Sequence, residues 1–86
     1  MIVKLSEDMA KLLIREVDGV DRLIKSSRVN EIEDNIELNI SDIDEVQLLI
    51  NDEIVYRGLD NQETANNLGK RLYALYDEIL YQKHNN

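Results

Sequence analysis

The chain has 86 residues and a formal net charge of −8 at pH 7, and it contains no Cys, Pro, Trp or Phe. The absence of Cys excludes disulfide bonds and thiolate metal sites, and the excess of negative charge disfavours direct binding to nucleic-acid phosphates. No apolar run approaches the roughly 20 residues of a membrane span, so the sequence predicts one small cytoplasmic domain over residues 1–86.

A short strand or coil at the N-terminus precedes the first predicted helix. Apolar residues recur every three or four positions from Met9 to Ile24, which is typical of a helix with one buried face. Ser6 is a suitable N-cap, because its hydroxyl can accept a hydrogen bond from a free backbone N–H. Gly19 interrupts the pattern, so we expect this helix to be either kinked or split there.

The pattern changes after residue 30. Apolar and polar residues alternate over residues 36–40, which indicates a half-buried strand. Two apolar runs, residues 46–50 and 54–57, flank three polar residues, and this arrangement predicts a β-hairpin. Leu49 and Val55 would share one face of that hairpin. Either the protein's own helices cover that face, or it is an exposed apolar strip available to a partner.

A long final helix is predicted from about residue 61 to about residue 82. Asp60 and Glu63 have the spacing of a capping box at its start. Apolar residues then recur at a helical spacing, and they are Ala65, Leu68, Leu72, Leu75 and Ile79. This stripe either covers the sheet or serves as a homodimer interface. A frayed tail is expected from about residue 83.

These elements predict an α+β fold. It consists of an N-terminal helix, either kinked or split at Gly19, a three-stranded antiparallel β-meander, and a long C-terminal helix packed on the sheet.

Negative charge is concentrated in the middle of the chain. Residues 29–63 contain eleven acidic residues and one basic residue, Arg57, which gives this segment a charge of −10. Such a segment either forms a surface for a basic partner or is a solvated edge that discourages aggregation. In charge and size the chain resembles phage-encoded inhibitors of nucleases and defence systems, which implies that carboxylates could occupy a nucleic-acid site in place of phosphates.

No group of residues predicts catalysis. His84 is the single histidine and lies close to the end of the chain, where a positioned base is not expected. Asp42, Asp44 and Glu45 lack the central Gly of an EF-hand loop. We therefore predict no enzymatic activity, no catalytic or metal-binding residues and no cofactor.

The sequence thus favours a small acidic protein that binds a partner protein with a basic surface, as an inhibitor could. The alternative is a homodimeric adaptor or structural domain that associates through the C-terminal helix and has a merely solvated acidic face. The predicted partner-binding residues are Glu31, Glu33, Asp34, Glu37, Asp42, Asp44, Glu45, Asp52, Glu53, Tyr73 and Tyr81.

Overall fold

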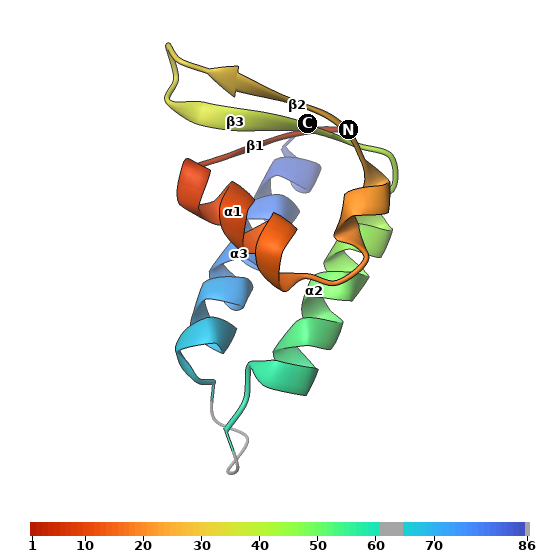
Figure 1. Cartoon of the computed structure of the whole chain (residues 1–86), viewed down its shortest axis with the longest axis vertical. Coiled ribbons are helices and arrows are strands. Elements are labelled where there is room, and N and C mark those ends of the chain that lie inside the picture. Colours follow the sequence, from red (N-terminus) through yellow and green to blue (C-terminus); the bar gives the residue numbers. More distant parts are fainter. Residues whose placement is uncertain (61–64, 86) are drawn as a thin grey trace.

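The computed structural model describes residues 1–60 and 65–85. It has an α+β fold in which one antiparallel sheet lies across the end of two long helices (Figure 1). The elements in chain order are β1 (Ile2–Leu5), α1 (Glu7–Glu16), a 3₁₀ helix η1 (Val20–Leu23), β2 (Ile24–Asn30), β3 (Asn35–Ile40), α2 (Ile43–Arg57) and α3 (Asn67–His84).

The sheet has three strands in the order β1-β3-β2, and both strand pairs are antiparallel. Leu38 of β3 lies opposite Val3 of β1 on one side and Ser27 of β2 on the other. An irregularity between Ile24 and Ser26 shifts the register at the start of β2. The predicted strand over residues 36–40 is confirmed as part of β3, while the first strand of the chain pairs with the last.

All the helices lie on one side of the sheet (Figure 1). Alternate residues of β1 and β3 are buried on that side, as expected for a half-buried sheet. The core combines these residues with apolar positions on every helix, and its members with no more than 2% exposure are Val3, Leu5, Ala10, Leu13, Val17, Val20, Leu38, Ile40, Val46, Ile50, Ile54, Leu72, Leu75 and Ile79.

The N-terminal helix is split near Gly19, which is one of the two predicted outcomes. Ser6 is its N-cap, since its hydroxyl accepts a hydrogen bond from the backbone N–H of Met9 at 3.2 Å. Helix α1 ends at Glu16, and Gly19 has a positive φ of 83° before η1 begins. Glycine adopts this left-handed conformation without the steric cost of a Cβ, so the chain can reverse and continue the buried apolar pattern at Val20.

The predicted hairpin over residues 46–57 is wrong, because this segment belongs to the single helix α2. The Asp42 side chain accepts a hydrogen bond from the backbone N–H of Glu45 at 3.1 Å and caps the helix. Its buried face includes Val46, Ile50 and Ile54, which repeat every four residues.

The predicted apolar strip of Leu49 and Val55 also changes with this correction. In helix α2 the two side chains no longer share a strand face. Leu49 packs partly buried against the core, whereas Val55 is largely exposed.

The long C-terminal helix packed on the sheet is confirmed. Leu72, Leu75 and Ile79 of its apolar stripe are fully buried within the chain, and Leu68 is half-buried. Helix α3 begins at Asn67, and Ala65 instead forms an isolated bridge with Leu59. The predicted capping residue Glu63 lies outside the described residues. The helix continues to His84, so residues 83 and 84, which were predicted to belong to a frayed tail, are part of the helix.

Candidate partner-binding surface

The β2–β3 turn, residues 31–34, carries three of the predicted acids at one corner of the molecule, above the start of α1 (Figure 1). Asp34 has a φ of 55°, which closes the turn in the left-handed region. Ile32 is 97% exposed at its apex. Within residues 1–60 and 65–85, Glu31 and Asp34 form no ion pair, so their charges face solvent.

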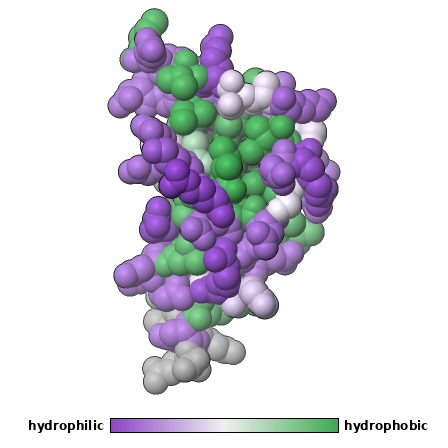
Figure 2. All heavy atoms as spheres, in the orientation of Figure 1, coloured by the Kyte–Doolittle hydropathy of each residue, from purple (hydrophilic) through white to green (hydrophobic). Residues whose placement is uncertain are grey.

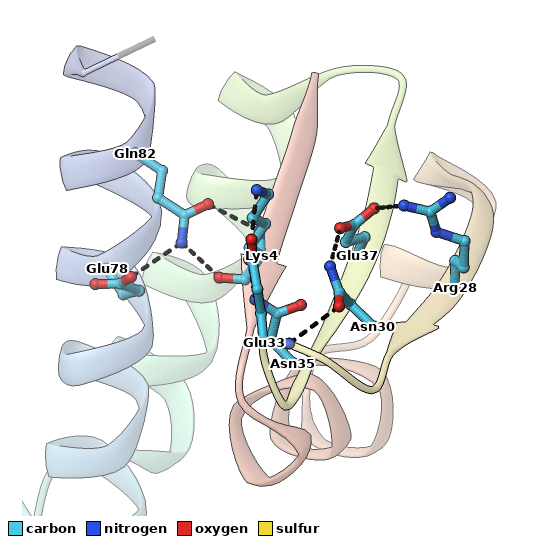
Figure 3. Close-up of polar contacts among 8 residues, drawn as sticks. All are labelled: Lys4, Arg28, Asn30, Glu33, Asn35, Glu37, Glu78 and Gln82. Atoms are coloured by element: carbon cyan, nitrogen blue, oxygen red, sulfur yellow. Dashed lines mark hydrogen bonds and ion pairs between the residues drawn. The ribbon is translucent and has the colours of Figure 1, made fainter.

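Asn30 holds this turn in place. Its side-chain oxygen accepts a hydrogen bond from the backbone N–H of Glu33 at 3.1 Å, and its side-chain N–H donates to Glu37 at 3.0 Å (Figure 3). Arg28 donates to the other carboxylate oxygen of Glu37 at 2.8 Å. The hydrogen bond from Asn30, opposed by partial desolvation and assisted by the charge of Arg28, lowers the pKa of Glu37. Glu37 therefore stabilises the hairpin rather than being free for a partner.

Glu33 is also engaged within the chain. Its carboxylate lies 3.6 Å from Nζ of Lys4 and accepts a hydrogen bond from the side chain of Asn35 at 3.2 Å. Both partners belong to the sheet (Figure 3). Of the acids predicted around this hairpin, Glu31 and Asp34 are thus the two with unengaged carboxylates among the described residues.

The acids at the start of α2 have structural partners. Asp42 is the N-cap, and Asp44 forms an ion pair with Lys83 of α3. Glu45 lies 3.5 Å from the guanidinium of Arg22 in η1. These contacts connect α2 to its neighbours, although exposed pairs of this kind contribute little to stability.

Glu53 is nearly buried and connects α2 to the end of α1. Its carboxylate accepts hydrogen bonds from the backbone N–H of Asp18 at 3.4 Å and from Nε of Arg57 at 2.8 Å. The hydrogen bond to Glu53 raises the pKa of Arg57, and Glu16 contributes further. Asp52, by contrast, is exposed and has no ion pair in the described part of the chain.

The structure therefore separates the predicted site residues into different surfaces. Glu31, Glu33 and Asp34 lie together in the turn, whereas the predicted acids of α2 lie along a helix. Tyr73 and Tyr81 are exposed on α3, and Tyr81 shares a shallow pocket with Lys4 and Asn35 of the sheet. On the face drawn in Figure 2, hydrophobic residues gather in the upper middle of the molecule, and hydrophilic residues surround them.

Two exposed apolar features were not predicted. Ile32 projects from the turn between two glutamates. The sequence contained one sign of this exposed residue, because Ile32 is a single apolar residue within a polar stretch. On α2, Leu48, Val55 and the 85% exposed Tyr56 share one helix face. That face could not be recognised while the segment was interpreted as a hairpin.

A hollow of about 310 Å³ lies beneath the turn. Val29 and Ile36 give it an apolar floor, and carboxylates surround it. The side-chain oxygen of Asn35, which also lines it, is buried and has no hydrogen-bond donor within the described residues. The residues around the hollow are Glu7, Val29, Asn30, Glu31, Asp34, Asn35 and Ile36.

No known protein family, curated protein or solved structure matches the chain. Over residues 1–60 and 65–85, no helix combines the length and apolarity needed to cross a membrane. In the same ranges no three His, Cys, Asp or Glu side chains are grouped so that they could hold a metal ion. The geometry thus defines an α+β domain with an acidic turn.

Proposed function

We propose that this chain is a small cytoplasmic protein without enzymatic activity that binds a basic surface of a partner protein through its β2–β3 turn. One observation carries this proposal. Glu31 and Asp34 are exposed at the tip of a hairpin, and they form no ion pair with any described residue. Carboxylates presented in this way can pair with cations without first breaking an internal contact.

The hollow beneath the turn supports a partner that inserts Arg or Lys side chains. Such a side chain has an apolar stem that could pack on Val29 and Ile36 and a cationic head that could reach Glu31 and Asp34. A purely apolar or acidic ligand would leave these groups unpaired.

A basic surface of this kind is typical of proteins that bind nucleic acids, so occupation of such a surface would make the chain an inhibitor. The carboxylates of the turn would then occupy the positions at which the partner binds nucleic-acid phosphates. The contact surface is smaller than the whole acidic segment, because Glu37 and Glu53 are already engaged within the chain.

The experiment is affinity capture from host lysate at low and high salt, followed by titration of the captured protein. We expect Glu31→Gln combined with Asp34→Asn to abolish capture, and high salt to weaken it for the unmodified chain. Asp21→Asn combined with Asp77→Asn is the matched control, because it makes the same change in net charge at exposed positions elsewhere. Equal capture by both variants would contradict the proposal.

A second candidate is an adaptor that associates through α2. It is favoured by the exposed apolar face formed by Leu48, Val55 and Tyr56. Binding through this face would persist at high salt and would be lost in Tyr56→Ser. The same titrations therefore distinguish the two functions.

A further inference from the structure

The two edges of the sheet differ in how they are protected. At the β1 edge, the backbone N–H of Lys4 donates to the side-chain oxygen of Gln82 at 2.8 Å, and the Gln82 side-chain N–H donates back to the Lys4 carbonyl at 2.5 Å (Figure 3). The Gln82 amide thus pairs with β1 as a strand residue would. At the opposite edge lies β2, on the side of the sheet away from α3 (Figure 3).

The hydrogen-bond pattern identifies which groups of β2 face outward. Ile40 exchanges both backbone hydrogen bonds with Met1, at 2.8 and 2.9 Å, so Ile40 and alternate residues of β3 face β1. The residues between them face β2, where Asn39 and Glu37 lie opposite Ser26 and Arg28. The backbone groups of the intervening β2 residues, Ser27 and Val29, therefore point away from the sheet.

The outer edge of β2 is open over the described residues. No strand pairs with it there, and Val29, next to the last residue of the strand, is 66% exposed. Unpaired N–H and C=O groups in a row can add another strand. The occupant must be compatible with the charges that flank this edge.

Charge is polarised along this strand. The basic residues Lys25 and Arg28 lie in β2, which contains no acidic residue, and the acids of the turn follow directly after it. Arg28 is paired with Glu37, but Lys25 at one end and Glu31 at the other form no ion pair within the described ranges. An identical strand added antiparallel would bring each basic end beside an acidic end, whereas a parallel strand would align like charges.

We propose that two copies of this chain associate through their β2 edges, antiparallel about a two-fold axis at Arg28. This arrangement joins the two three-stranded sheets into one continuous sheet. It lets Ser27 of each copy exchange backbone hydrogen bonds with Val29 of the other and places Lys25 of each copy opposite Glu31 of the other. Because the proposed partner surface also uses Glu31, self-association and partner binding exclude one another at this strand.

Sedimentation velocity of the whole chain, from micromolar to millimolar concentration, tests this pairing. We expect a monomer–dimer equilibrium that Lys25→Glu and Glu31→Lys each weaken by about tenfold or more, since each reversal sets like charges together. The combined variant exchanges the two charges and should restore the dimer. Lys70→Glu is the matched control for Lys25→Glu, because it gives the same net charge at an exposed position of α3 and should leave the dimer intact.

Circular dichroism on each variant confirms that it is folded, and amide hydrogen exchange supplies an independent readout. We expect the outward N–H groups of Ser27 and Val29 to become protected as concentration rises. A wild-type chain that stays monomeric throughout the concentration range would overturn the proposal. So would a folded combined variant that fails to regain the affinity lost by the single reversals.

Discussion

Asn30 shows how a single side chain can set the shape of an exposed turn. One end of its amide accepts from the backbone of Glu33, and the other donates to the carboxylate of Glu37. These bonds orient the turn before any partner arrives, so less conformational freedom is lost on binding. The bond that Asn30 donates to Glu37 also stabilises the charged form of that carboxylate, which makes the hairpin sensitive to acid.

Glu37→Gln should reduce the loss of stability on acidification. The pKa of Glu37 is lowered in the folded chain, so its stabilisation is complete above the ordinary glutamate pKa of about 4.3 and is lost as the pH falls through the lowered value. Urea unfolding at a series of pH values measures this dependence. Arg28→Gln should have a smaller effect, because the hydrogen bond from Asn30 still lowers the pKa of Glu37 in that variant. Parallel curves for wild type and Glu37→Gln would contradict this account.

At the scale of elements, α2 and α3 meet through their backbones. A Cβ added to Gly69 would lie 2.0 Å from the carbonyl oxygen of Gly58, so no larger residue fits without a shift of one helix. Asn66 reinforces the junction, since its side chain caps α3 at Gly69 and donates to the carbonyl of Arg57 at 2.9 Å.

Gly69→Ala should therefore destabilise the chain, although alanine is normally the better helix former. We expect a loss of about 1 to 3 kcal/mol from the overpacked contact, measured by urea unfolding. Lys70→Ala, one position further along the same helix and exposed, is the control and should leave the free energy of unfolding nearly unchanged. A stabilised Gly69→Ala would show that the helices separate without cost.

Gln82→Ala should uncover the β1 edge. We expect a cost of about 1 kcal/mol for the lost hydrogen bonds and faster amide exchange at Lys4. The amide of Leu38 in the central strand serves as the internal reference and should keep its protection. Unchanged exchange at Lys4 would mean that the Gln82 contact does not protect this edge.

The sequence correctly predicts the elements in which apolar residues recur at one regular spacing. Helix α3 and strand β3 show it, because each buries one regular face. Helix α2 does not, since exposed Leu48 and Val55 fill the gaps between its buried residues and hide the helical repeat. Asp42 and Glu45 nevertheless have the capping spacing that was recognised at Asp60 and Glu63, so the start of α2 was readable in the sequence.

For the whole molecule, the sequence shows which segment of the chain is acidic, but it does not predict which of these acids share one partner-binding surface. The acids lie within one segment of the chain, but that segment forms both the β2–β3 turn and helix α2. The acids therefore lie on different surfaces of the molecule. Ion pairs such as Glu45 with Arg22 join residues far apart in sequence, and neither composition nor periodicity reveals them. The candidate partner-binding site is therefore smaller than the acidic segment and consists of the turn that carries Glu31 and Asp34.

The net charge of −8 also has a measurable effect on stability. Self-repulsion of like charges destabilises the compact state, and mobile ions screen it. We expect the Tm to rise as NaCl increases from about 0.01 M to about 0.5 M, because the Debye length falls from about 30 Å to well below 10 Å over this range. Differential scanning calorimetry measures this. A Tm that falls with salt would mean that ion pairs such as Lys4 with Glu33 outweigh the repulsion.

The contact between Lys4 and Gln82 spans 78 positions of sequence, and it has a consequence for synthesis on the ribosome. The hairpin of β2 and β3 is local and can form early, but β1 must wait for β3 and then for nearly the last turn of α3. Until Gln82 has left the exit tunnel, the first strand keeps an unpaired edge. The outer edge of β1 is therefore covered later than the sheet itself is formed, and until then this edge is available to chaperones.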